Sequence, residues 1–314
     1  MPPVPLHALR PAGVPAPPTA PDDPRLGRWL AEQTAVRDAT RVALVGFPSD
    51  AGVVRNGGRP GAALGPRALR EALYRLAPDA RDAGPFSALL DATVDLGDVP
   101  VSGDVEADQE RLGGVVAALL DRGVFPVVLG GGHETAYGHA LGYLTSGRAF
   151  DLLNWDAHAD VRPLHDGLGH SGSPFRQALE HESGLARRYT AAGLHPWRVS
   201  ADHATYVSRQ GTAVWAAELD AAGVDALTAS IGTPTLASFD LDAVDGAPGV
   251  SAPGVGGISP SLWLRAAEAC GASRAVSSVD VVELSPPHDT DGRTATLAAL
   301  TVWHVLRGLA RRTG

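Results

Sequence analysis

Short continuous apolar runs alternate with longer amphipathic segments along most of the chain. Short segments of four to eight mainly apolar residues are typical of buried strands, and here they cover residues 42–47, 125–129, 150–155, 236–240 and 275–282. Helices are predicted between them, at residues 65–77, 105–121, 259–270 and 294–312. Strands separated by helices predict βαβ units, which build an α/β fold with a mainly parallel sheet and helices on both faces.

Two segments depart from this alternation. Prolines recur through residues 2–24, so we expect residues 1–40 to form an extended, partly disordered arm, and residues 41–314 to form one folded domain. The arm has no apolar core of the kind found in signal peptides. Residues 163–211 are rich in His, Ser and Gly, and we expect them to form long loops over the sheet.

Composition narrows the class of protein. Hydrophobic residues make up 44% of the 314 positions and charged residues 19%, which is enough for a large buried core. The net charge of −9 argues against non-specific nucleic-acid binding, and no apolar run is long enough to predict a membrane span. Cys270 is the only cysteine, so disulfides within the chain and cysteine-based zinc sites are excluded, and we expect a cytoplasmic protein. All basic residues are arginine, which excludes Schiff-base chemistry on lysine.

Polar clusters follow three of the predicted strands directly. They are Gly130-Gly131-Gly132-His133-Glu134, Asn154-Trp155-Asp156-Ala157-His158-Ala159-Asp160, and Ser238-Phe239-Asp240-Leu241-Asp242-Ala243-Val244-Asp245. Each has an ordinary alternative by itself: a structural histidine, a turn or helix N-cap, or a glycine-rich phosphate loop. In open α/β sheets, however, ligands bind beyond the carboxyl ends of the strands, where all three clusters would meet.

The charges in these clusters point to metal ions. Two carboxylates ~4 Å apart repel by roughly 4 kcal/mol at an effective dielectric constant near 20, so crowded carboxylates require a cation. One divalent ion would leave two of the four carboxylates of Asp156, Asp160, Asp240 and Asp242 unbalanced, whereas two ions balance all four. Carboxylates combined with the imidazoles of His133 and His158 suit manganese better than structural zinc. The sequence therefore predicts a dinuclear manganese site.

At these residues the sequence resembles the ureohydrolase superfamily of arginases, agmatinases and formimidoylglutamases. Gly131-Gly132-His133, Asp156-Ala157-His158-Ala159-Asp160 and the Ser238–Asp245 segment are similar to three motifs of that family, in the same order. The resemblance covers roughly residues 41–312 and implies a three-layer α/β/α arginase-like fold. It also implies that two Mn²⁺ ions are bound by His133, Asp156, His158, Asp160, Asp240 and Asp242, and that the protein forms a homo-oligomer, a trimer or hexamer.

Within the superfamily, the departures from the arginase pattern favour formimidoylglutamase. Gly132-His133-Glu134 replaces the Asp-His-Ser of arginases and agmatinases, and Ser171 stands where those enzymes have a proton-shuttling histidine. The Asn154 start of the second cluster and the Arg162 that follows it also resemble formimidoylglutamases. So does Asn56-Gly57-Gly58-Arg59 before the first predicted helix, for which a glycine-rich turn is an equal alternative.

The resemblance implies hydrolysis of N-formimidoyl-L-glutamate to L-glutamate and formamide, a step of histidine degradation. Asp160 would act as the proton carrier, and Glu283 would hold the cationic amidinium. Arg162 is the first candidate for a substrate carboxylate because its guanidinium fork matches that group, with Asn154 and Arg59 as further substrate-binding candidates. Two alternatives remain open: hydrolysis of a guanidino compound such as agmatine, guanidinobutyrate or arginine with release of urea, and a non-catalytic metal-stabilised binding protein.

Overall fold

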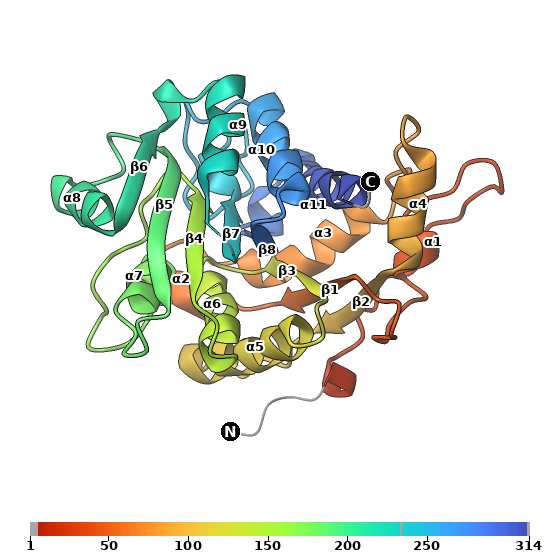
Figure 1. Cartoon of the computed structure of the whole chain (residues 1–314), viewed down its shortest axis with the longest axis horizontal. Coiled ribbons are helices and arrows are strands. Elements are labelled where there is room, and N and C mark those ends of the chain that lie inside the picture. Colours follow the sequence, from red (N-terminus) through yellow and green to blue (C-terminus); the bar gives the residue numbers. More distant parts are fainter. Residues whose placement is uncertain (1–5, 233, 313–314) are drawn as a thin grey trace.

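A single eight-stranded parallel sheet forms the centre of the computed structural model, which describes residues 6–232 and 234–312 (Figure 1). The strands are β1 (Val42–Phe47), β2 (Thr93–Asp98), β3 (Phe125–Gly130), β4 (Phe150–Trp155), β5 (Ala186–Leu194), β6 (Gly211–Trp215), β7 (Thr235–Asp240) and β8 (Val276–Val282). Their order across the sheet is β2-β1-β3-β8-β7-β4-β5-β6, and every pair of neighbours is parallel. The predicted parallel α/β fold is confirmed.

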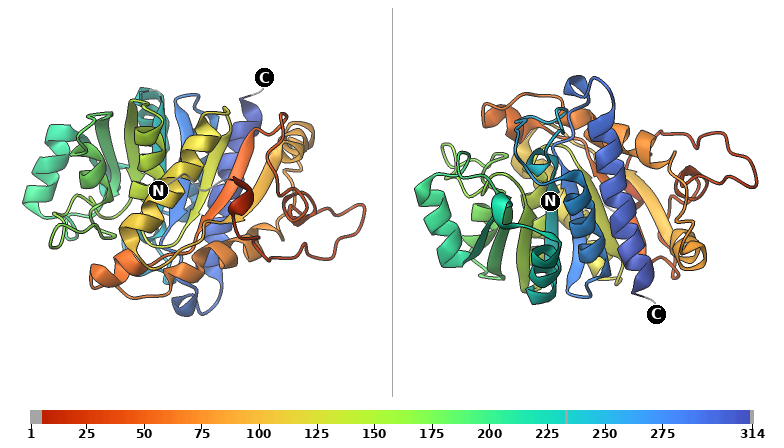
Figure 2. Two further views of the ribbon diagram at one scale, coloured as in Figure 1. Left: turned by 90° about the horizontal axis from the view of Figure 1, so that it is seen from below. Right: turned by 90° about the horizontal axis from the view of Figure 1, so that it is seen from above.

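Helices cover both faces of this sheet. They are α1 (Gly27–Leu30), α2 (Ala51–Arg55), α3 (Gly65–Leu73), α4 (Ala83–Asp91), α5 (Val105–Leu120), α6 (Thr135–Thr145), α7 (Pro174–Leu179), α8 (Ala201–Gln210), α9 (Ala221–Ser230), α10 (Pro260–Ala272) and α11 (Arg293–Arg311). In Figure 2, α10 and α11 lie over one face and α5 over the other. Successive side chains of a strand pack into the hydrophobic cores on opposite faces of the sheet. Val127 belongs to the core on the side of α3, α10 and α11, and Val128 belongs to the core on the side of α5 and α6. This alternation produces the three layers that were expected.

The prediction of long loops over residues 163–211 is wrong. That segment contains α7, β5 and α8 and ends where β6 begins, and β5 and β6 complete one edge of the sheet. The signal was weak because β5 and β6 lie toward this edge and mix alanine, threonine and arginine with few large apolar residues. Strands at a sheet edge need less apolar surface than central strands, so their sequences lose the continuous apolar run.

Strand β2 at the opposite edge was also missed, since its sequence Thr-Val-Asp-Leu-Gly-Asp is half polar. The structure explains these polar residues by the fully buried guanidinium of Arg70. Its Nε lies 2.8 Å from Asp95 Oδ2, and its Nη1 lies 2.5 Å from Asp98 Oδ1. The pairing supplies the counter-charge that a buried carboxylate requires.

The described part of the proline-rich arm lies along the β2 edge. Arg10 pairs with Asp98 in an isolated antiparallel bridge, and Leu26 and Leu30 are fully buried in the core on the α3 side. Residues 1–5 of the arm and residues 313–314 of the domain lie outside the described residues, and the division at residues 40 and 41 stays a prediction. Among the residues that the structure describes, no helix is long and apolar enough to cross a membrane.

Candidate metal centre

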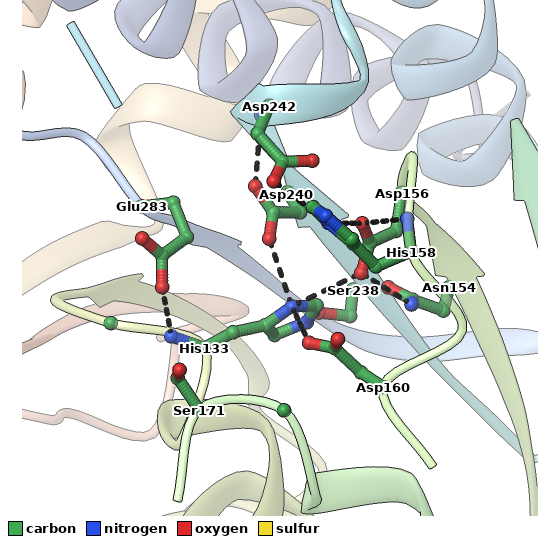
Figure 3. Close-up of polar contacts among 12 residues, drawn as sticks. His133, Asn154, Asp156, His158, Asp160, Ser171, Ser238, Asp240, Asp242 and Glu283 are labelled. Atoms are coloured by element: carbon green, nitrogen blue, oxygen red, sulfur yellow. Dashed lines mark hydrogen bonds and ion pairs between the residues drawn. The ribbon is translucent and has the colours of Figure 1, made fainter. Parts of the chain in front are cut away.

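Four adjacent strands end at one point of the sheet, and three of them carry all the predicted metal ligands there (Figure 3). His133 follows β3, and Asp156, His158 and Asp160 follow β4. Asp240 is the last residue of β7, and Asp242 lies in the short 3₁₀ helix Leu241–Ala243. β8 and β7 lie between β3 and β4, so the chain order of the clusters conceals how close they are in space.

The first group of ligands surrounds one nitrogen of His133. Its Nδ1 lies 2.9 Å from Asp160 Oδ2, 3.0 Å from Asp240 Oδ2 and 3.3 Å from Asp156 Oδ2. The ligand atoms of these four residues all lie within 4.8 Å of one another, which is close enough to hold one ion. One imidazole and three carboxylates therefore form the first candidate metal site, which we call site 1.

The second group lies directly beside the first and shares a residue with it. His158 Nδ1 is 3.0 Å from Asp242 Oδ2 and 3.4 Å from Asp156 Oδ1. We call the group of Asp156, His158 and Asp242 site 2. Because Asp156 contributes Oδ2 to site 1 and Oδ1 to site 2, its carboxylate spans both.

Backbone geometry fixes the orientation of these carboxylates. Asp156 Oδ1 accepts the backbone N–H of His158 at 2.6 Å, and Asp240 Oδ1 accepts that of Asp242 at 2.8 Å. These local bonds explain the Asp-x-His and Asp-x-Asp spacing, since each first carboxylate caps the turn that presents the next ligand. Asp160 has a positive φ of 46°, a conformation that costs free energy and is found at functional sites.

The glycines before His133 permit a close approach of two loops. The N–H of Gly132 donates to the carbonyl of Ser49 at 2.8 Å, and a Cβ on Gly131 would collide with that same carbonyl. The carbonyl of Gly131 accepts the N–H of Glu283 at 2.8 Å. The triple glycine therefore joins the β3 loop to its neighbours on both sides, which explains it without a phosphate ligand.

The crowding of buried charges shifts the pKa values of the cluster. Burial and the charges of Asp242 and Asp156 raise the pKa of Asp240 well above its usual range. Burial alone would lower the pKa of His158, but the carboxylates of Asp242 and Asp156 raise it to about 12. The shifts are large because Asp156, Asp240 and Asp242 are at most 4% exposed, so water screens their charges little and positive charge close to them is stabilised.

The donor set fits two divalent cations. Four buried carboxylates and two imidazoles provide hard oxygen ligands with some nitrogen, the combination preferred by manganese. Among the described residues, the nearest guanidinium to reach the cluster is that of Arg198, whose Nη1 is 4.0 Å from Asp242 Oδ2. A single cation at that distance does not balance four carboxylates, so the arrangement requires metal ions.

A cavity of about 180 Å³ opens onto the two sites. Its lining combines metal ligands with residues of the loops around them: Val53, Asn56, Gly57, Gly58, His133, His158, Asp160, Arg162, Ser171, Asp240, Asp242, Ser251, Ala252 and Glu283. The cavity holds five of the six predicted ligands, and Asp156 lies fully buried beneath them. Its size suits a small molecule.

Two of the predicted substrate-binding residues face this cavity. Arg162 is exposed and lines it, with Nη1 3.2 Å from Asn56 Oδ1. Glu283 lines it from the end of β8, where its Oε1 accepts the backbone N–H of His133 at 2.7 Å and its Oε2 accepts the hydroxyl of Ser251. Burial raises the pKa of Glu283 to about 7. The cavity thus combines a guanidinium with an acidic floor.

The other two substrate-binding candidates lie outside the cavity lining. Asn154 is fully buried, and its amide donates to Asp156 Oδ2 at 3.0 Å, so it orients a metal ligand. The guanidinium of Arg59 donates to the carbonyls of Val250 and Ser251, which positions the loop that carries Ser251. Neither residue has the placement expected of a substrate contact.

The structure adds residues around the cavity that the sequence analysis did not single out as site residues. Asn56 belongs to the Asn-Gly-Gly-Arg segment that drew attention to Arg59, and its Nδ2 donates to Ser171 Oγ at 3.0 Å. The Arg198 guanidinium donates to the carbonyls of Ala252 and Pro253 and has Nη1 3.2 Å from His158 Nε2. Arg198 and Ser251 lie in loops with no recognisable pattern, so only the three-dimensional structure identifies them.

Comparisons with known proteins agree with this site. The profile of the arginase family matches residues 40–307. Formimidoylglutamase of Rhodococcus opacus (strain B4) is 38% identical over 308 residues, which cover 89% of this chain and 90% of the relative. Formimidoylglutamase of Nocardia farcinica (strain IFM 10152) is 42% identical over 275 residues, 83% of this chain and 84% of the relative. The crystal structure of Trypanosoma cruzi formiminoglutamase with Mn²⁺ superposes with a TM-score of 0.84 at 34% identity, covering 93% of this chain and 100% of that one.

Proposed function

Because the chain belongs to the arginase family, we propose that it is a manganese-dependent hydrolase that cleaves N-formimidoyl-L-glutamate to L-glutamate and formamide. Relatives that carry the name formimidoylglutamase match most of its length. The reaction breaks the C–N bond of a linear amidine, and it would serve histidine degradation. All six predicted ligand residues are present and converge on one point, which argues against a non-catalytic scaffold.

The observation that carries the choice of substrate is the exposed guanidinium of Arg162 on the wall of an acidic cavity. Formimidoylglutamate has one cationic amidinium and two carboxylates. An acidic floor suits the amidinium, and a guanidinium at the wall suits a carboxylate. Agmatine is cationic and has no carboxylate, so Arg162 would repel it. By the family resemblance, Ser171 stands where arginases and agmatinases have a proton-shuttling histidine.

Different residues of the site would bind the metal ions and the substrate. His133, Asp156, Asp160 and Asp240 would hold one Mn²⁺ ion, and Asp156, His158 and Asp242 would hold the second. When bound, the two ions lower the pKa of a water molecule and so supply a nucleophile at neutral pH. Glu283 would bind the amidinium through its carboxylate, which the His133 N–H and the Ser251 hydroxyl hold in place.

Proton transfer would fall to Asp160, whose carboxylate lines the cavity. It would take the proton of the attacking water and deliver it to the nitrogen of the departing glutamate. Its positive φ places the carboxylate between His133 and the cavity, since Oδ2 is 2.9 Å from His133 Nδ1.

A substrate panel tests the proposal. Purified protein is stripped with a chelator, reloaded with Mn²⁺, and assayed for formamide, urea and ammonia from formimidoylglutamate, agmatine, guanidinobutyrate and arginine. We expect formamide from formimidoylglutamate at the highest kcat/KM, and no turnover before reloading. Faster release of urea from a guanidino compound would show that the substrate assignment is wrong.

Two further expectations belong with this proposal. A homo-oligomer, trimer or hexamer, is expected from the family resemblance, and light scattering after size-exclusion chromatography measures it. A cytoplasmic location agrees with the single, buried and free Cys270, and cell fractionation measures that.

A further inference from the structure

A chain of buried polar side chains runs from the metal centre into the layer between the sheet and α6. It passes from His133 to Ser238, Asp280 and His139, and then to Ser278 and Tyr143. All six side chains are at most 1% exposed. Apart from His133, none of them lines the cavity, and an apolar layer normally excludes such groups unless they are paired.

The strand order creates this chain of contacts. β8 lies between β3 and β7, and Asp280 is in register with Ser238 on β7 and with Val128 on β3. Asp280 therefore lies one strand away from the end of β3, where His133 begins the site. His139 reaches it from α6, with Nδ1 2.7 Å from Asp280 Oδ2.

Metal binding by His133 would determine which atom donates and which accepts in each hydrogen bond between His133, Ser238 and Asp280. A ring nitrogen that coordinates a metal must offer its lone pair, and His133 Nδ1 is the nitrogen that faces the carboxylates of site 1. The proton then belongs to Nε2, which lies 3.0 Å from Ser238 Oγ. Ser238 Oγ then accepts the hydrogen bond from this N–H and its own O–H donates one to Asp280 Oδ1, while Asp280 Oδ2 accepts another from His139 Nδ1.

We infer that Asp280 is a positioning residue for the metal centre, and that it acts through Ser238 to fix the ring orientation and tautomer of His133. Ser238 is the only hydroxyl that the described residues place on His133 Nε2. His139 holds the other oxygen of Asp280, and His139 Nε2 in turn lies 2.6 Å from Ser278 Oγ. The inference rests on the proposed metal site. A purely structural role for Asp280 is the competing explanation.

The experiment measures Mn²⁺ binding to the chelator-stripped protein, with free Mn²⁺ followed by electron paramagnetic resonance. We expect Ser238→Ala to weaken one of two Mn²⁺ sites by about 10- to 100-fold, the usual effect of losing a partner of a ligating histidine. The other site should keep its wild-type affinity. Ser277→Ala is the matched control. Ser277 contacts Tyr143, at the end of the polar chain far from the metal centre, and the carbonyl of Thr235, so the change should leave both affinities unchanged.

A double-mutant cycle separates positioning from a structural role. Asp280→Asn should weaken the same site in the wild-type background and add little in the Ser238→Ala background, because the link to His133 is already broken. Thermal unfolding of the same four proteins should instead show a further loss of stability from Asp280→Asn in both backgrounds, since a buried partner of His139 is altered.

Each outcome decides one of the two hypotheses. Unchanged Mn²⁺ affinity in Ser238→Ala, or equal weakening by Asp280→Asn in both backgrounds, overturns the positioning role and leaves the proposed function intact. Failure of the wild-type protein to bind two Mn²⁺ ions overturns the proposed metal centre, and the inference with it. Selective loss at one site with a non-additive cycle supports the inference.

Discussion

Replacement of Arg162 by alanine should impair recognition of formimidoylglutamate while leaving the metal centre whole. The guanidinium is exposed on the cavity wall, and its hydrogen bond to a side chain is the one to Asn56 at 3.2 Å. Within residues 6–232 and 234–312 it forms no ion pair, so its charge is available to a substrate carboxylate. A charge-assisted hydrogen bond contributes about 1.5–3 kcal/mol.

This free energy corresponds to roughly a 10- to 100-fold fall in kcat/KM, at ~1.4 kcal/mol for each factor of ten. Most of the change should be in KM, because the carboxylate is bound equally in the ground state and the transition state. Arg162→Lys should recover only part of the loss, since an ammonium keeps the charge but not the two parallel donors. Arg176→Ala is the matched control, because Arg176 pairs with Glu180 on α7 and does not line the cavity.

A second substrate completes the assay. N-formimidoylglycine lacks the distal carboxylate, so a similar fall for both substrates would place Arg162 on the carboxylate nearest the amidine. A fall for formimidoylglutamate alone would place it on the distal carboxylate. The reasoning is refuted if Arg162→Ala changes kcat/KM for formimidoylglutamate by less than threefold. A changed Mn²⁺ content with unchanged KM would instead make Arg162 a support of the metal site.

Three further changes test other parts of the structure. Asp156→Asn should weaken both Mn²⁺ sites, because the two oxygens of Asp156 face different ligand groups. Asp160→Asn should weaken only site 1. Equal metal loss in the two variants would contradict the division into two sites. If ionised Glu283 binds the amidinium, kcat/KM should rise with pH up to at most about 7, since burial raises this pKa and bound cations would lower it again. Glu283→Gln should lower kcat/KM and remove that rise, and a pH profile that keeps it would exclude Glu283 as its origin. Arg70→Ala should lower the free energy of unfolding in urea by about 3–5 kcal/mol, since it leaves the Asp95 carboxylate buried without its partner; a loss below about 1 kcal/mol would contradict this role.

The central strands could be predicted because burial on both faces leaves a direct trace in the sequence. Strands β1 and β3 contain no polar side chain, β4 contains two among large apolar residues, and all three match the expected ranges to within one residue. β2 and β6 left no such trace. β2 carries the carboxylates that pair with Arg70, and that pairing joins residues 25 positions apart, so no local pattern records it.

The metal ligands could be identified for a related reason. Each ligand lies within a few residues of a strand end, and alternate ligands are separated by one residue because the first carboxylate caps the turn that presents the second. The other residues that line the cavity lack this constraint. Arg162 was accessible to reasoning because it follows a ligand by two residues, whereas Asn56 and Ser251 reach the cavity from distant loops.

Asp280 shows where the limit of sequence reasoning lies and why. It is one of three polar residues in β8, and polar residues inside a strand by themselves indicate only a weak strand. The role proposed for Asp280 depends on the order of the strands, because only the placement of β8 between β3 and β7 brings Asp280 next to Ser238 and close to His133. The same strand order brings the ends of β3, β4 and β7 together at the candidate metal centre. Candidate ligands that follow strand ends can thus be predicted from the sequence. The residues that orient them can be identified only when the order of the strands in the sheet is known.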